Sequence, residues 1–384
     1  MTHLEQIKQD FYTHFAQNPI VYRSPGRVNL IGEHTDYNEG FVLPGAINKF
    51  IYLAISPRED DEIYLISKNT NSSANFKIGN LQKNSNGWSD YIIGIVDQLI
   101  KKDYKIKGFN CVFSGDIPMG AGLSSSAALE CATVYALNEL NNLGISKLDQ
   151  VKIAQKAENE YVGVKCGIMD QFASMLGKEN MVFKLDCRSL EYEYFPLKMD
   201  GYSIVLCDSG VKHSLASSEY NVRRQQCEEG VGILKKHYPS INSLRDVSIE
   251  MLKSHTIEFS PKVLDRCMYV VEEIKRLIEA TEDLKNGNTE AFGKKMFETH
   301  YGLKNLYEVS CKELDILVQM AEKNNNVLGS RMMGGGFGGC TINLIKEEGV
   351  TNFVEYAKTH YPIETGKELL VYTVKLESGT CRLD

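Results

Sequence analysis

The chain has 384 residues, more than a single hydrophobic core usually serves, so its length predicts two domains. It carries 43 Lys and Arg against 50 Asp and Glu, a net charge of -7 without long basic runs, which argues against nucleic-acid binding. No segment approaches about 18 consecutive apolar residues, so we expect no membrane span and no membrane partner. The ten cysteines show neither C-x-x-C pairs nor zinc-ligand spacing, which predicts reduced thiols and a cytoplasmic protein.

The predicted elements mix helices and strands. Apolar residues at helical spacing predict a surface helix in residues 1–17, and β-rich runs follow at 51–56, 109–114 and 202–207. Three further helices are expected: one capped by Ser89, one from the serines at 124–126 to residue 143, and one capped by Ser146 that carries Glu158. Their irregular alternation with strands favours an α+β architecture over a repeated βαβ ladder.

Glycines and serines lie in residues 118–128 (P-M-G-A-G-L-S-S-S-A-A), at a strand-to-helix junction. Gly120 and Gly122 let backbone amides approach an anion, and the free amides and dipole of the helix start favour negative charge. Serine hydroxyls there can hold phosphate oxygens or Mg²⁺. The alternative is a serine-capped turn without a ligand. Because the chain has no GxxxxGK[ST] sequence, any nucleotide site belongs to a class other than the P-loop proteins.

A dense polar cluster occupies residues 26–37 (G-R-V-N-L-I-G-E-H-T-D-Y). Carboxylates, an imidazole and a tyrosine supply the donors and acceptors that sugar hydroxyls require, and Arg27 supplies a fixed cation. The alternative is a capped loop with a surface salt bridge. Residues 166–171 (C-G-I-M-D-Q) add Asp170 between apolar neighbours, either a catalytic base or a helix cap.

The fourth segment, residues 329–340, is rich in glycine and leads into a strand-like run at 341–345. Its G-x-G-x-x-G match is not read as a dinucleotide site, because the glycines precede a strand and no helix follows where a Rossmann unit needs one. A closely approached backbone, structural or covering a phosphate, explains the glycines better.

Taken together, and in their order along the chain, these segments resemble the GHMP small-molecule kinases. Residues 26–37 closely resemble the galactokinase signature. Segments 120–128, 329–340, 166–171 and 217–227 (S-S-E-Y-N-V-R-R-Q-Q-C) extend the similarity over residues 23–345. The resemblance implies a two-lobed α+β GHMP-kinase-like fold with the active site in the cleft between the lobes. We expect residues 1–195 to form the N-terminal lobe and residues 196–384 the C-terminal lobe.

The resemblance also implies residue roles. Arg27 would stabilise charge in the transition state, and Asp170 would face the C1 hydroxyl of the sugar. The residues expected to hold galactose are Glu33, His34, Thr35, Asp36, Gly167, Asp170 and Tyr220. The residues expected to hold the nucleotide are Gly120, Ala121, Gly122, Leu123, Ser124, Ser125 and Ser126, with Ser67 and Trp88 near the nucleoside. Ser125 or Ser126, together with Glu158, would coordinate Mg²⁺.

The implied activity is ATP-dependent phosphorylation of the anomeric C1 hydroxyl of α-D-galactose to galactose 1-phosphate and ADP, the first step of galactose catabolism by the Leloir pathway. D-galactose and MgATP are the implied ligands, with no obligate protein partner. The alternatives are a 1-kinase for N-acetylgalactosamine or another sugar, and a galactose and ATP sensor without turnover. Intact Arg27, Asp170 and Ser126-Ala127 count against the sensor.

Overall fold

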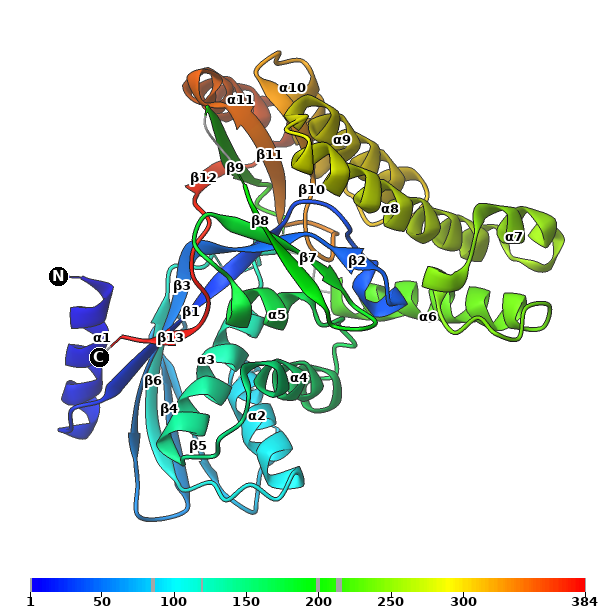
Figure 1. Ribbon diagram of the computed structural model, residues 1–384. Coiled ribbons are helices and arrows are strands. Elements are labelled where there is room, and N and C mark those ends of the chain that lie inside the picture. The colour runs from blue at the N-terminus through cyan, green and yellow to red at the C-terminus, as the bar shows by residue number, and fades with distance from the viewer. Residues whose placement is uncertain (1, 84–86, 119, 198–200, 212–215, 384) are drawn as a thin grey trace.

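The computed structural model describes residues 2–83, 87–118, 120–197, 201–211 and 216–383; Met119, within the predicted phosphate-binding segment, lies outside them (Figure 1). The strands are β1 (Ile20–Asn29), β2 (Phe41–Val42), β3 (Pro44–Pro57), β4 (Glu62–Ser67), β5 (Ser72–Lys77), β6 (Phe109–Gly115), β7 (Met181–Asp186), β8 (Tyr192–Pro196), β9 (Tyr202–Asp208), β10 (Val327–Met332), β11 (Cys340–Lys346), β12 (Leu370–Val374) and β13 (Cys381–Arg382).

The helices are α1 (His3–Phe15), α2 (Ser89–Lys101), α3 (Ser125–Leu140), α4 (Lys147–Ala157), α5 (Met169–Leu176), α6 (Ala216–Lys235), α7 (Ile249–Ser254), α8 (Pro261–Lys285), α9 (Thr289–Asn305), α10 (Lys312–Glu322) and α11 (Val350–Thr365). The short helical turns are η1 (Asp36–Asn38), η2 (Glu158–Val162), η3 (Leu244–Asp246), η4 (Thr256–Glu258) and η5 (Glu347–Gly349). Four expected strands, 51–56, 109–114, 202–207 and 341–345, fall inside β3, β6, β9 and β11, which confirms them.

Three sheets organise the fold. The largest has the order β13-β1-β3-β6-β4-β5, the second β10-β11-β9-β12 and the third β2-β7-β8. Helices α3 and α5 contact the first sheet from the side opposite α1, whereas α9 and α10 contact β10 of the second sheet (Figure 1). In β4, buried residues alternate with partly exposed ones, as expected for a strand with one covered face, whereas most of β3 is buried at the sheet centre.

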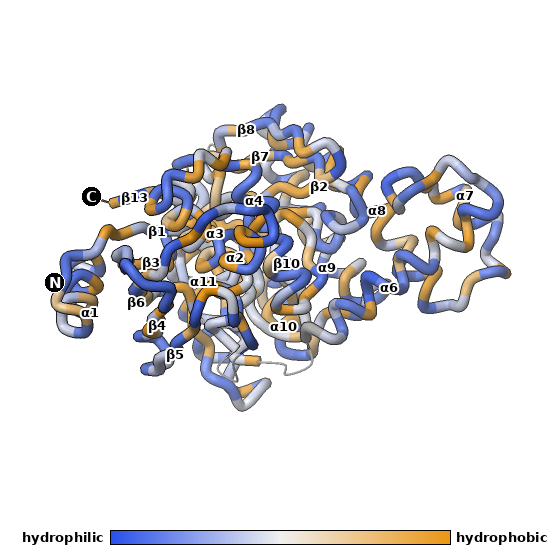
Figure 2. Tube along the Cα trace, turned by 90° about the horizontal axis from the view of Figure 1, so that it is seen from below, coloured by the Kyte–Doolittle hydropathy of each residue, from blue (hydrophilic) through white to orange (hydrophobic). Residues whose placement is uncertain are grey.

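Residues from both halves of the chain share a core. The main buried cluster joins Ile51 and Leu53 of β3 with Ile342 of β11 and Phe292 of α9. The C-terminal strand β13 returns to pair with β1, so the two ends of the chain lie close together (Figure 1). The division at residue 195 stays a prediction. Figure 2 shows α7 and the neighbouring end of α6 extending away from the other elements, as Figure 1 also does.

Local signals explain some helix boundaries, and the structure corrects two expectations. Thr2 caps α1 through a complete capping box, and Ser146 caps α4 by accepting a hydrogen bond from the Asp149 amide. Ser89 does not cap α2: it is the first helical residue, and its buried hydroxyl has no hydrogen bond within the described residues. The helix expected to reach residue 143 ends at Leu140.

All ten cysteines are free thiols, as expected. Among the residues that the structure describes, no helix is long and apolar enough to cross a lipid bilayer.

Candidate active site

A cavity of about 130 Å³ collects residues from all the segments singled out in the sequence except 118–128. By volume it holds roughly ten water-sized spheres, a space suited to a monosaccharide. Its lining residues are Arg27, Glu33, His34, Asp36, Glu158, Val164, Cys166, Gly167, Met169, Asp170, Tyr220, Gly334 and Gly335.

Arg27 and Asp170 line this cavity and face each other. The Arg27 Nε and Nη2 atoms donate to the two carboxylate oxygens of Asp170 at 2.8 and 2.9 Å, a bidentate pair. The Arg27 Nη1 atom donates to the carbonyl of Gly122 at 2.6 Å, and the Ser124 hydroxyl donates to Asp170. Burial lowers the pKa of Arg27, but the charges of Asp170 and Glu33 outweigh this effect and raise it overall. The pair therefore joins the cavity to the 120–126 turn.

The 120–126 turn has the backbone shape expected for anion binding. Gly120, Gly122 and Ser124 have φ values of 80°, 75° and 59°, and α3 begins directly afterwards at Ser125. Since the Ser124 side chain makes no capping hydrogen bond, the first amides of α3 keep their donors for a ligand. Gly120 is exposed and Ser124–Ser126 are partly exposed, so the turn is open to solvent, while Ala121 and Leu123 are buried.

A bulge in β1 brings this turn against the polar cluster of the first motif. The pairing of β1 with β3 shifts register between Pro25 and Arg27, and the Arg27 amide donates to the carbonyl of Leu123. A Cβ atom on Gly26 would lie 2.7 Å from that carbonyl oxygen, so only glycine fits there. The bulge therefore sets how closely the cation of Arg27 approaches the turn.

The glycine-rich segment between β10 and β11 also packs against this turn. A Cβ atom on Gly122 would lie 3.2 Å from the carbonyl oxygen of Met333, and one on Gly339 would lie 3.1 Å from that of Ala121. The glycines thus serve close backbone approach between two loops. No helix follows them, as expected, because the chain enters β11 directly.

Asp36 is fixed against the backbone of Gly167. A Cβ atom added to Gly167 would lie 1.9 Å from the Oδ2 atom of Asp36, so a side chain is excluded there. The Tyr37 amide donates to Oδ1 at 2.9 Å. Burial, followed by the charge of Asp170, raises the pKa of Asp36 to about 7. The carboxyl group thus lies in a desolvated position where polar sugar groups can replace lost water.

Glu33 is held by a partner that the sequence did not reveal. The Arg331 Nη1 atom donates to the Oε1 atom of Glu33 at 3.1 Å, and the Gly334 amide donates to the same oxygen at 2.9 Å. Arg331 is fully buried and also donates to the carbonyls of Leu30 and Met332. This buried pair ties the first motif to the glycine-rich segment.

His34 is placed by its own backbone and by neighbouring rings. Its φ of 62° is unusual for a residue with a side chain, and its Nδ1 atom lies 2.7 Å from the hydroxyl of Tyr37. Burial lowers its pKa to about 3, so the imidazole is neutral. Its Nε2 atom is buried without a hydrogen bond of ordinary geometry among the described residues, and its ring centroid lies 5.2 Å from that of Tyr220. A neutral imidazole can donate to or accept from a ligand hydroxyl.

Glu158 belongs to a buried pair of acids. The Gln171 Nε2 atom donates to the Oε2 atoms of Glu158 and Glu130 at 2.7 and 3.0 Å. Burial, followed by the charge of Asp170, raises the pKa of Glu158 to about 7. Burial, followed by the charge of Glu158, also raises the pKa of Glu130 well above its ordinary value. Glu130, which the sequence reasoning missed, interrupts the apolar pattern of α3 four residues after Ser126 and therefore lies on the same helix face.

Besides the residues of the 120–126 turn, three expected ligand contacts lie outside the cavity. The Thr35 hydroxyl is fully buried and donates to the carbonyls of Gly32 and Phe41, so it closes the motif loop. Ser67 is buried at the end of β4, where its hydroxyl accepts from the Thr70 amide. Trp88 packs on Phe113, the β6 residue that pairs with Ser67. Its indole nitrogen donates to the hydroxyl of Ser72, which also pairs with Ser67, so Trp88 and Ser67 are neighbours at the turn from β4 to β5.

Comparison with known proteins agrees with this geometry. The families that match are the GHMP kinases N terminal domain over residues 90–178, the GHMP kinases C terminal over 280–363 and the Galactokinase galactose-binding signature over 9–57. A mevalonate kinase structure, 19% identical, superposes with a TM-score of 0.65 over 94% of this chain and 99% of its own. These results define a GHMP-type kinase and confirm the expected α+β fold.

Closer relatives narrow the class. Galactokinase of Thermotoga neapolitana is 44% identical over 94% of this chain and 99% of its own length, and that of Clostridium beijerinckii is 40% identical over the full length of both. The crystal structure of Lactococcus lactis galactokinase complexed with galactose matches with a TM-score of 0.95 and 35% identity over all of both chains. The chain belongs to the galactokinase family of GHMP kinases and is a kinase by activity.

Proposed function

We propose that the chain transfers the γ-phosphoryl group of MgATP to the anomeric C1 hydroxyl of α-D-galactose, forming galactose 1-phosphate and ADP, as the first step of galactose catabolism. The observation that carries the proposal is the bidentate pair of Arg27 and Asp170, set in a sugar-sized cavity and bonded to Gly122 and Ser124 of the 120–126 turn. The galactose bound to the Lactococcus lactis relative supports the choice of sugar. We place the enzyme in the cytoplasm; its ten free thiols support that placement.

Each residue of the pair has a separate task in this mechanism. Phosphoryl transfer passes through a loose transition state, so positioning and charge stabilisation outweigh covalent help. Asp170 orients the C1 hydroxyl and accepts its proton as the bond to phosphorus forms. Arg27 then offsets charge on the transferring group, for which its contact with the turn prepares it. The amides of residues 120–126 hold the β-phosphate at the start of α3.

Sugar and metal ligands complete the proposal. Glu33, His34, Asp36, Gly167 and Tyr220 surround galactose in the cavity, while Thr35 acts indirectly by closing the loop. Glu158 and one hydroxyl of Ser125 or Ser126 would hold Mg²⁺, which would neutralise phosphate charge when bound. A carboxylate that lines the cavity and a hydroxyl at the helix start form the oxygen donor set that Mg²⁺ prefers. Trp88 and Ser67 are proposed beside the nucleoside.

A coupled assay of ADP release, with MgATP and either galactose, N-acetylgalactosamine, glucose or arabinose, tests the proposal. We expect turnover with galactose and a fall in kcat of about 10² to 10⁴ in Asp170→Asn, with a modest change in KM. If the enzyme turned over only one of the other sugars, that sugar and not galactose would be its substrate. Tight galactose binding without any turnover would identify a sensor, and normal turnover in Asp170→Asn would remove Asp170 from the mechanism.

A further inference from the structure

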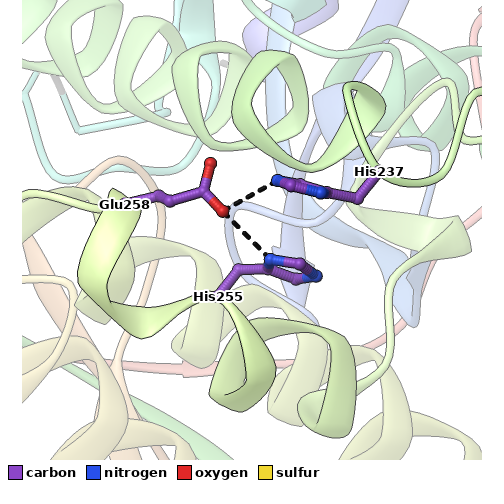
Figure 3. A group of neighbouring side chains, drawn as sticks. All are labelled: His237, His255 and Glu258. Carbon is purple, nitrogen blue, oxygen red and sulfur yellow. Dashed lines mark hydrogen bonds and ion pairs between the residues drawn. The ribbon is translucent and has the colours of Figure 1, made fainter.

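Figure 3 shows two histidines and a glutamate whose side chains meet, and all three are at least partly exposed. His237 lies two positions after α6, and His255 and Glu258 lie in the turn between α7 and α8. The His237 Nε2 atom is 2.7 Å and the His255 Nδ1 atom 3.0 Å from the same oxygen, Oε1 of Glu258. All three donor atoms lie within 4.8 Å of one another. None of the three touches the active-site cavity.

These distances suit ligands that share one metal ion. Zinc binds imidazole nitrogen and carboxylate oxygen at about 2.0 to 2.2 Å, and tetrahedral geometry then separates neighbouring ligand atoms by roughly 3 Å. The two imidazole rings are stacked, with centroids 3.9 Å apart and planes 22° from parallel. They must splay slightly to aim both nitrogens at one ion. Since both side chains are partly exposed, this rotation meets little resistance, and the solvent side leaves room for a water ligand.

The donor types also favour a transition metal over Mg²⁺ or Ca²⁺. Imidazole nitrogen is a poor ligand for Mg²⁺ and Ca²⁺ but a good one for zinc and its neighbours, and two imidazoles with one carboxylate form a set that zinc sites use. Within the residues that the structure describes, no other three His, Cys, Asp or Glu side chains converge in this way.

We propose that His237, His255 and Glu258 bind one divalent transition-metal ion, with Zn²⁺ as the representative ion. The ion clamps the turn after α6 to the turn before α8, two segments 18 positions apart at the end of the molecule that extends outward in Figures 1 and 2. This site is independent of the phosphoryl transfer proposed above. Its role is to hold the protruding α6–α7 region in place, because metal that binds only the folded arrangement stabilises it.

The test is a Zn²⁺ titration of the full chain against a chromophoric chelator, without nucleotide and with excess Mg²⁺ to fill sites built from oxygen ligands. We expect one Zn²⁺ per chain. The affinity should fall at least tenfold in both His237→Asn and Glu258→Gln and stay unchanged in His360→Asn, a matched exposed histidine on α11. Zn²⁺ should raise the melting temperature of the wild type and of His360→Asn only.

Three results would overturn the proposal: no stoichiometric zinc, equal affinity in all four proteins, or sulfur ligands in the zinc X-ray absorption spectrum. The last would show that free cysteines bind the metal instead. Far-UV circular dichroism of the metal-free variants confirms that they are folded, and both altered positions lie at the surface, where substitution costs little stability.

Discussion

Replacing Arg331 by methionine tests whether Glu33 depends on the glycine-rich segment. In the wild type, the Arg331 guanidinium donates to the Glu33 carboxylate at 3.1 Å and to the carbonyls of Leu30 at 2.9 Å and Met332 at 2.6 Å. Methionine fills a similar volume but removes every one of these donors. Glu33, only 2% exposed, then keeps the Gly334 amide as its partner but loses the guanidinium that pairs with it directly.

The expected magnitude follows from this burial. Breaking a buried ion pair by removing one partner costs about 3 to 5 kcal/mol, because an uncompensated charge stays buried. Adding Glu33→Gln to Arg331→Met removes that charge, so the double variant should be more stable than the sum of the single effects by at least about 1 kcal/mol. The pair of a partly exposed Arg224 and an exposed Glu228 provides a control: Arg224→Met should cost no more than about 1 kcal/mol.

Urea unfolding followed by circular dichroism gives the stabilities, and steady-state kinetics with galactose gives the functional effect. We expect a raised KM for galactose in Arg331→Met, since Glu33 lines the cavity. The reasoning would be refuted if Arg331→Met stayed within about 0.5 kcal/mol of the wild type, or if the two substitutions were additive.

Three further predictions concern the cavity itself. Gly167→Ala must displace Asp36, because the Oδ2 atom of Asp36 would lie 1.9 Å from the new Cβ atom. The KM for galactose should therefore rise at least about tenfold. An unchanged KM would argue that Asp36 does not contact the sugar. Because the pKa of Glu158 is about 7, the Mg²⁺ affinity measured by calorimetry should rise between about pH 6 and pH 8, as deprotonation frees this carboxylate to bind the metal. Glu158→Gln should abolish this rise. A wild-type affinity that does not change with pH would contradict the assignment of Glu158 as a metal ligand. In the metal-free protein, the raised pKa of Glu158 makes the free energy of unfolding fall as the pH rises. The stability that neutral Glu158 contributes is fully present below the ordinary pKa of a glutamate and is lost as the pH rises through about 7. Arg27→Lys keeps the charge but loses the bidentate fork to Asp170, so kcat should fall by about 10² or more, whereas normal turnover would make Arg27 a structural partner.

The sequence singled out two residues that line the cavity, Arg27 and Asp170, because its residue types and motif order are specific. Arg27 and Asp170 are 143 positions apart, yet the chemistry expected of each requires a shared ligand, and the structure joins them directly. Gly167 was predicted by resemblance. The Asp36 carboxylate lies against its backbone, which explains why this position must be glycine.

Other features could not be predicted because they depend on tertiary partners. Arg331, the partner of Glu33, lies 298 positions away along the chain, inside a segment whose sequence is dominated by glycines. Glu130 left a faint signal, an acid in an otherwise apolar stretch of α3. Ser89 looked like a helix cap from its local sequence, but it is fully buried one position inside α2, where packing overrides capping preference.

The most direct test of the mechanism is a crystal structure of the chain with galactose and a non-hydrolysable MgATP analogue. We expect a carboxylate oxygen of Asp170 within about 2.6 to 3.2 Å of the C1 hydroxyl, with the β-phosphate on the amides of residues 120–126. Galactose with C1 turned away from Asp170, or a triphosphate bound elsewhere, would contradict the account.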